Sequence, residues 1–243
     1  MSFGIRMSSS PGQYYYGELE DNTANGLGFG RFQDGIYIGN WKDGDMDGKG
    51  IFLHDDMTVL CGQWRSGKPL FETDGVQKGD LAGTGDLDQF AYEPNKDGYF
   101  AYSGEINSNK KAGEGLGIIY FQNSKYFTYI GEIRDNQPKG FGFLQYSDGE
   151  FYIGEMESVE HYGILMNGEG LASYKKDGMF HYGNFYHGKV HGKGVYVYDE
   201  FNVDEGDWEM GDPGESIIQR EATDTEARML VFFQSYYRNN IRN

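Results

Sequence analysis

Residues 37–50 read YIGNWKDGDMDGKG, and the spacing inside this stretch decides the fold. Counted from the tyrosine at offset 0, glycine stands at offset 2, tryptophan at offset 4, and glycine again at offsets 7, 11 and 13. Units with the same spacing begin at Tyr15, Tyr37, Tyr102, Tyr129 and His181. A register of six positions that returns five times identifies a repeat protein.

Three further units are imperfect. The units that begin at Leu60 and Tyr152 have their glycine pair delayed, and the last unit, around Gly206, has none. The chain therefore contains about eight repeats.

The offsets predict a β-hairpin. Offsets 0, 2 and 4 share one face of a strand. Offset 7 is glycine or asparagine, the residues that best tolerate positive φ in a two-residue turn. Offsets 11 and 13 lie on the returning strand, where glycine leaves bare backbone on which a neighbouring ring can pack. Asp-Gly pairs between units, such as Asp34-Gly35 and Asp148-Gly149, predict the turns that join one hairpin to the next.

The pattern Y-x-G-x-W-x-x-G-x-x-x-G-x-G resembles the MORN repeat (membrane occupation and recognition nexus), from residue 14 to about 211. The resemblance implies an elongated, twisted, single-layer antiparallel sheet with an aromatic groove. It also implies a role as a cytoskeletal, ciliary or membrane-contact scaffold. The fold class we predict is all-β: a single-layer meander of about eight hairpins, followed by a C-terminal helix.

The expected organisation has three parts. Residues 1–13 form an N-terminal extension, residues 14–212 the repeat array, and residues 213–243 a helical segment. Two insertions, at about 68–101 and 157–167, interrupt the register. Insertions in repeat arrays often form binding loops, but they are also tolerated as decoration. The sequence leaves both interpretations open.

The C-terminal segment predicts a helix. Thr223 and Glu226 have the spacing of a capping box, and a glycine-free stretch follows. The helix would be apolar over more than half of its circumference, so it must be buried. It either caps the open edge of the last hairpin or inserts into a partner or a second copy. The candidate contact residues are Met229, Phe232, Phe233 and Tyr236.

The net charge of −17 argues against nucleic acid and anionic membranes as partners and favours basic segments of other proteins. The single cysteine, Cys61, excludes an internal disulfide. The sequence shows no signal peptide and no apolar run of transmembrane length, so we expect a cytoplasmic protein.

We expect no catalytic residues, cofactor or metal. Asp43, Asp45 and Asp47 match the opening of a calcium loop, but His54 stands where a bidentate glutamate belongs. His187 and His191 fall in predicted hairpin turns and have no further ligands nearby in the pattern.

The function we expect is a non-catalytic scaffold of the cytoskeleton, such as a subunit of a ciliary or flagellar axoneme. A peripheral membrane adaptor that binds lipid head groups is the alternative. Whether the chain pairs with a second copy stays open. The protein-binding groove would be lined by Tyr37, Trp41, Trp64, Tyr102, Tyr129, Phe185 and Trp208.

Overall fold

The computed structural model describes residues 2–10, 12–71, 81–83, 92–95, 98–106, 112–121, 126–135, 137–159 and 163–240. The chain divides into two compact units. Unit 1 contains Met1–Ser124 and Thr128–Phe143, and unit 2 contains Lys125–Phe127 and Leu144–Asn243.

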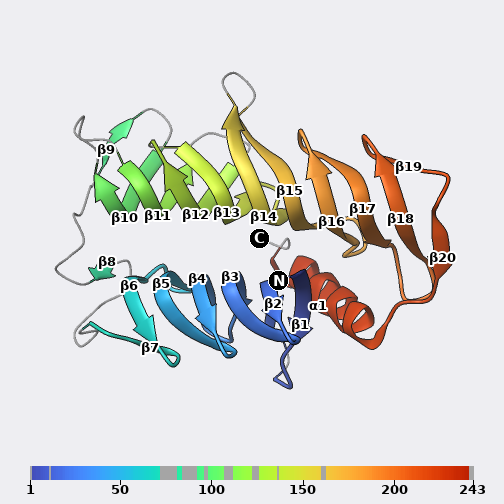
Figure 1. Ribbon diagram of the computed structural model, residues 1–243, viewed down its shortest axis with the longest axis horizontal. Coiled ribbons are helices and arrows are strands. Elements are labelled where there is room, and N and C mark those ends of the chain that lie inside the picture. Colours follow the sequence, from blue (N-terminus) through green and yellow to red (C-terminus); the bar gives the residue numbers. More distant parts are fainter. Residues whose placement is uncertain are drawn as a thin grey trace. The chain divides into compact units, whose positions relative to one another are not determined.

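The first sheet lies in unit 1 and follows the sequence strand by strand (Figure 1). Its strands are β1 (Ser2–Met7), β2 (Tyr14–Glu20), β3 (Thr23–Arg31), β4 (Gly35–Lys42), β5 (Asp45–His54), β6 (Val59–Arg65), β7 (Lys68–Pro69) and β8 (Leu81–Gly83). Neighbours from β1 to β7 pair in antiparallel hairpins, and β8 pairs in parallel with β6.

The second sheet continues the same pattern from β9 to β19, and β20 pairs with β18. Its strands are β9 (Tyr92–Asn95), β10 (Gly98–Ile106), β11 (Ala112–Phe121), β12 (Tyr126–Arg134), β13 (Gln137–Tyr146), β14 (Phe151–Val159), β15 (Gly163–Ser173), β16 (Phe180–Tyr186), β17 (Lys189–Val197), β18 (Val203–Glu209), β19 (Asp212–Pro213) and β20 (Ile218–Arg220). The antiparallel meander is confirmed. It is divided into two sheets between β8 and β9, within the stretch 68–101 where the repeat register breaks in the sequence.

The hairpin turns use two residues with positive φ. Asp43 and Gly44 have φ of 51° and 90°, which is the backbone of a type I′ turn. The corresponding pairs are Asp21/Asn22, Ser66/Gly67, His187/Gly188 and Met210/Gly211. The sequence predicted positive φ at offset 7. The structure adds offset 6, where aspartate, serine, histidine or methionine takes the same conformation.

The second glycine of the G-x-G pair, which stands at offset 13 in the regular units, is required by a close approach. A Cβ atom at Gly50 would collide with the ring of Tyr37, and Gly170 meets Tyr152 in the same way. Tyrosine rings therefore lie directly on glycine backbone, as the repeat spacing predicted.

The insertions are placed only in part. In the stretch 157–167, Glu157 pairs with Leu165 and Val159 with Gly163, so this insertion lengthens the β14–β15 hairpin. Residues 160–162 at its tip lie outside the described residues. Of the stretch 68–101, the structure describes β7, β8, β9 and the start of β10.

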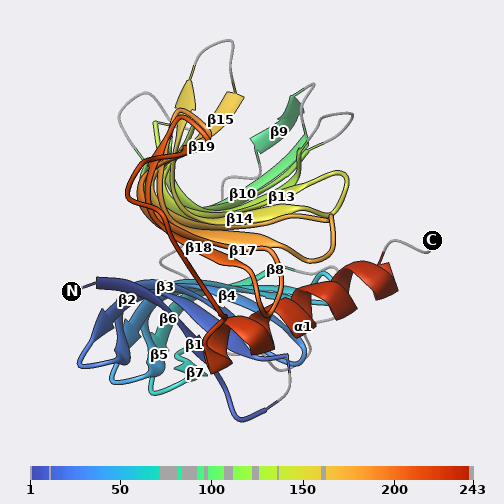
Figure 2. The same cartoon turned by 90° about the vertical axis from the view of Figure 1, so that its right-hand side faces the viewer.

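The helix α1 (Asp224–Asn240), labelled and coloured red in Figure 2, belongs by its contacts to unit 2. The ring of Phe233 packs edge-on against Phe151 and Phe180, with ring centroids 5.4 Å apart in both pairs. The helix therefore covers one face of the β14–β16 strands. The expectation that it caps the edge of the last hairpin is corrected, because β19 and β20 pair with β18 there.

Candidate functional site: the ring face

We define the ring face as the face of each sheet that carries the side chains at offsets 0, 2 and 4. In unit 1, Tyr37, Trp41 and Trp64 lie on this face and join one buried cluster with Tyr15 and Phe52. Tyr129 is also buried in unit 1. The rings predicted to line a groove therefore form much of the core on this side of the sheet.

Phe185 and Trp208 lie on the ring face of unit 2 and are buried as well. Phe185 packs edge-on against Tyr152, with ring centroids 5.1 Å apart. Tyr102 lies in β10, and its side chain is outside the described residues. The predicted set thus falls into separate groups in the two units.

Each ring-face tryptophan is tied to the preceding hairpin. The indole nitrogen Nε1 of Trp41 donates a hydrogen bond to the carbonyl oxygen of Gly28 at 3.1 Å. Trp64 donates in the same way to Gly50 at 3.2 Å, and Trp208 to Gly194 at 3.3 Å. In each case the tryptophan at offset 4 of one unit donates to the carbonyl oxygen of the glycine at offset 13 of the unit before it.

The tyrosines at offset 0 are fixed by their hydroxyl groups. The hydroxyl of Tyr37 donates to the carbonyl oxygen of Asn40 at 3.1 Å, and that of Tyr129 donates to Glu132 at 2.6 Å. Burial raises the pKa of both phenols well above the usual value. The hydroxyls therefore stay protonated, as donation requires.

The residue at offset 3 supplies a bond that sequence reasoning missed. Glu132 accepts a hydrogen bond from the backbone nitrogen of Phe141 at 2.7 Å. Asn40 instead donates to the carbonyl oxygen of Lys49 at 3.1 Å. Glutamate or asparagine recurs at this offset in the sequence, and that recurrence is the signal that could have revealed the bond.

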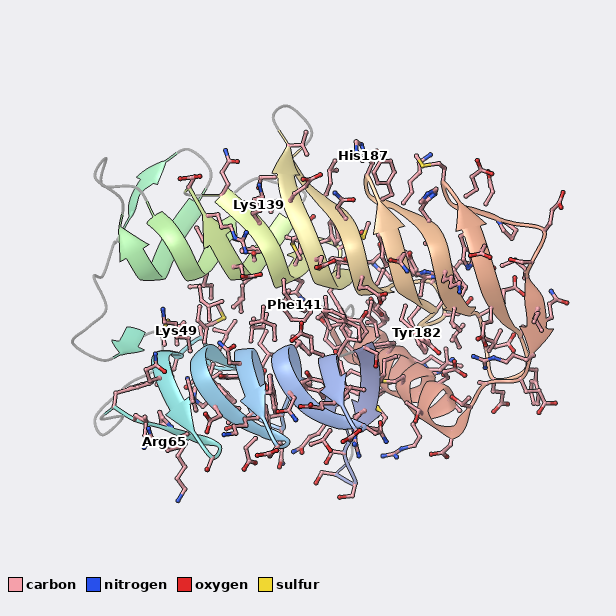
Figure 3. All side chains as sticks on the ribbon, in the orientation of Figure 1. Lys49, Arg65, Lys139, Phe141, Tyr182 and His187 are labelled. Carbon is pink, nitrogen blue, oxygen red and sulfur yellow. The ribbon has the colours of Figure 1, made fainter. Side chains whose placement is uncertain are left out.

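The turns are also bonded to the returning strand of the preceding hairpin. The side chain of Asp47 accepts from the backbone nitrogen of Ser66 at 3.3 Å. His191 accepts in the same way, through Nδ1, from Met210 at 3.4 Å. His187 lies at a hairpin tip (Figure 3). In the described part of the chain, no group of three or more His, Cys, Asp or Glu side chains could hold a metal ion.

His181 occupies the tyrosine position of its unit but lacks the tyrosine hydrogen bond. Its imidazole is fully buried, and neither ring nitrogen has a hydrogen-bond partner among the residues that the structure describes. Its ring lies edge-on to Phe185 and Trp208, at 5.2 and 5.6 Å. Burial lowers the pKa of His181 to about 3 because the charged form loses its hydration.

An open pocket of about 470 Å³ lies at the N-terminal end of the ring face in unit 1. Its aromatic wall consists of Tyr15, Phe32 and Trp41. Polar and charged side chains also line it: Arg6, Ser8, Ser9, Gln13 and Arg31. Sequence reasoning missed Arg6 and Phe32, because both lie outside the six positions of the repeat register.

The C-terminal helix residues contact their own unit. Met229 and Phe233 are buried, and Phe232 and Tyr236 are half-buried. The hydroxyl of Tyr236 accepts a hydrogen bond from Gln145 at 2.8 Å. Intramolecular packing thus accounts for much of this apolar surface.

The start of the helix is anchored by a buried carboxylate. The predicted capping box is confirmed: the backbone nitrogen of Thr223 donates to Glu226 at 2.6 Å, and that of Glu226 to the Thr223 hydroxyl at 3.3 Å. Arg220 binds both oxygens of Glu226, and Tyr182 donates to it at 2.6 Å. Burial alone would raise the pKa of Glu226, but these hydrogen bonds outweigh it and lower the pKa to about 2.

Repeated hairpins, interlocked by bonds between equivalent offsets, define a stacked-hairpin repeat protein. The family model of the MORN repeat matches residues 37–56, 129–151 and 181–202. The chain therefore carries MORN repeats at these three positions. A comparison with curated proteins finds no match.

The MORN repeat is an interaction module and does not define a class of enzyme. Repeats of this family mediate interactions with proteins or membranes. No helix among the described residues is long and apolar enough to cross a bilayer.

Proposed function

We propose that the protein is a non-catalytic scaffold that docks other proteins through its ring face and its acidic surface. The observation that carries this proposal is the fixed state of the ring-face aromatics. Trp41 and Trp64 are held by hydrogen bonds to the neighbouring hairpin, and Tyr37 is held within its own. These three rings are buried and form a rigid base for the half-buried rings of the same face, such as Phe32. A surface that is already ordered in this way loses little conformational entropy when a partner binds.

The net negative charge of the chain favours the binding of partner proteins that carry basic segments. The chain carries 38 acidic and 21 basic residues, so the field around it attracts cations and repels anionic surfaces. On this ground we favour protein docking over lipid head groups. The resemblance to MORN proteins extends the proposal to a structural subunit of a cytoskeletal or ciliary complex.

The test must use residues that line the ring face without holding it together. Phe32 is half-buried and stacks on Trp41, with ring centroids 6.2 Å apart and an interplanar angle of 3°. Tyr198 is half-buried and stacks on Tyr196 in unit 2, with centroids 4.5 Å apart. The variant Phe32→Ser/Tyr198→Ser removes both rings and leaves the buried cluster intact.

Proteins captured from the native source by the immobilised chain would be quantified by mass spectrometry. We expect the double variant to lose its specific partners, while the matched control Phe201→Ser, which changes a ring exposed in a turn, retains them. Circular dichroism must show that both variants fold. Undiminished capture by the double variant would refute docking through the ring face, and flotation with anionic vesicles at physiological salt would favour the membrane adaptor instead.

A further inference from the structure

The pocket of unit 1 differs in charge from the rest of the chain. None of its lining residues is aspartate or glutamate, although acidic residues outnumber basic ones in the sequence by 38 to 21. Two of its lining residues, Arg6 and Arg31, are cations. The pocket is therefore a local site of positive charge in an acidic protein.

The two arginines are not equivalent. Arg31 binds Asp55 through both terminal nitrogens, at 2.8 and 2.9 Å, so its charge is already matched. Arg6 is exposed and forms no ion pair with a described residue. Arg6 pairs with Tyr15 in the β1–β2 register, which places its side chain on the ring face. Arg6 is thus a cation available to a ligand.

The aromatic wall beside Arg6 is rigid. Trp41 is fixed by its bond to Gly28, packs edge-on against Tyr15 at 5.0 Å, and stacks on Phe32. A wall of this kind accepts a flat or branched apolar side chain, because the ring faces are ordered before the ligand arrives. The volume of about 470 Å³ lies in the range typical of ligand pockets.

We propose that this pocket binds an acidic segment of a partner protein that carries an aromatic or large aliphatic side chain. The apolar side chain packs against Trp41 and Phe32, and a neighbouring carboxylate pairs with the guanidinium of Arg6. This inference rests on the proposed function and adds to it the direction in which a docked segment lies along the ring face. The acidic part of a docked segment lies at the N-terminal end of the ring face, while its basic part lies over the acidic remainder of the protein.

Charge complementarity favours a peptide over a membrane. One unpaired arginine beside an aromatic wall matches a single carboxylate next to an apolar side chain. Anionic head groups are usually held by clusters of several basic side chains, and the net charge of −17 opposes an anionic bilayer.

The probe is an acetylated and amidated five-residue peptide with phenylalanine at its centre and two glutamates on each side. Binding to the full chain is followed by NMR through the Trp41 indole signal and the backbone signals of Arg6 and Phe32. We expect saturable shifts at these positions. Replacing the glutamates with lysine, or the phenylalanine with alanine, is expected to weaken binding about tenfold or more.

The variant Arg6→Glu should weaken binding of the acidic peptide about tenfold or more, and Arg6→Gln by less. The matched control Arg65→Glu makes the same charge change in β6, outside the pocket lining (Figure 3), and should alter binding less than about twofold. Circular dichroism and thermal melting verify that each variant is folded.

In the peptide experiments, each of three results would overturn the proposal: no saturable shift up to about 2 mM peptide, equal binding of the lysine peptide, or equal losses in Arg6→Glu and Arg65→Glu. Binding to phosphatidylserine vesicles that depends on Arg6, without peptide binding, would overturn it in favour of a lipid head group. If the peptide fails while Phe32→Ser/Tyr198→Ser still loses its captured partners, only the ligand is misassigned and the scaffold function stands. Failure of both experiments would reject both proposals.

Discussion

The indole nitrogen of Trp41 lies 3.1 Å from the carbonyl oxygen of Gly28, and this hydrogen bond joins two successive hairpins. The same relationship connects Trp64 to Gly50 in the next unit. A single hairpin is at best marginally stable in water. Bonds and ring contacts between neighbours therefore supply much of the cooperativity of the array.

Replacing Trp41 with phenylalanine should lower the free energy of unfolding by about 1–3 kcal/mol, because a buried hydrogen bond to Gly28 is lost and part of the ring volume is vacated. Urea denaturation followed by circular dichroism measures the change. The control Tyr186→Phe, at an exposed ring, should change stability by less than about 0.5 kcal/mol. Equal stability of Trp41→Phe and the wild-type chain would show that the indole bond contributes nothing net.

Alanine at Gly50 should destabilise unit 1 by about 3 kcal/mol or more, because its Cβ atom would overlap the buried ring of Tyr37. The matched control is Gly67→Asn at a turn tip, where a Cβ atom added to the glycine would meet no described atom within 4 Å other than those of its chain neighbours. Asn22 takes the equivalent position of another unit with φ of 60°, so asparagine should be tolerated there. Thermal melting compares the two variants, and a Gly50→Ala melting temperature as high as that of Gly67→Asn would contradict this account of the ring packing.

His181 should make the protein sensitive to mild acid. The pKa is lowered from about 6.5 in the unfolded chain to about 3 in the folded one, so between these values the unfolded chain binds more protons. The stabilising contribution is therefore complete above pH 6.5 and declines as the pH falls towards 3. At pH 5 the loss should be about 2 kcal/mol.

The variant His181→Tyr tests whether the buried imidazole causes this sensitivity to acid. Tyrosine at the equivalent positions Tyr37 and Tyr129 donates to the residue three positions later, so we expect the new hydroxyl to bond to the carbonyl of Asn184. Urea denaturation at pH 7 and pH 5 should show a smaller loss in His181→Tyr than in the wild-type chain. The control His187→Asn, at a turn tip, should keep the wild-type loss, and an unchanged loss in His181→Tyr would assign the acid sensitivity to other groups.

Replacing Arg220 with methionine should release the start of α1, since it leaves the carboxylate of Glu226 buried without its cation. We expect a loss of about 3 kcal/mol, as for other buried pairs that lose one partner. Faster hydrogen exchange in α1 would locate the effect. The control Arg228→Gln removes an exposed pair with Asp224 at 4.0 Å and should cost less than about 0.5 kcal/mol. Similar exchange rates in the two variants would contradict the role of Arg220 as an anchor.

The anchor formed by Arg220 and Glu226 also depends on pH. Because the pKa of Glu226 is lowered to about 2, its contribution is present above the unfolded value near 4.5 and is lost as the pH falls towards 2. Exchange measured at pH 6 and pH 3.5 should therefore differ more in the wild-type chain than in Glu226→Gln.

Much of the fold could be predicted from local spacing. Glycine at offsets 7, 11 and 13 specifies a turn and a bare returning strand, and the rings at offsets 0 and 4 specify what packs there. The capping box at Thr223 and Glu226 is equally local, since both partners lie within one helical turn. The site was less predictable. The pocket combines Arg6, Phe32 and Trp41 from three strand regions, and their proximity depends on pairing between β1, β2, β3 and β4.

The sequence alone determined the repeat, the strand pairing of each hairpin and the helix, because these follow from backbone sterics and from contacts between residues close in the chain. Only the tertiary structure decided which face α1 covers and how deeply the rings at offsets 0 and 4 are buried. It also decided that Arg220 reaches Glu226, while Arg6 forms no ion pair with a residue that the structure describes. Those outcomes depend on packing and ion pairing between side chains of separate elements, whose free energies are set by burial and not by spacing along the chain.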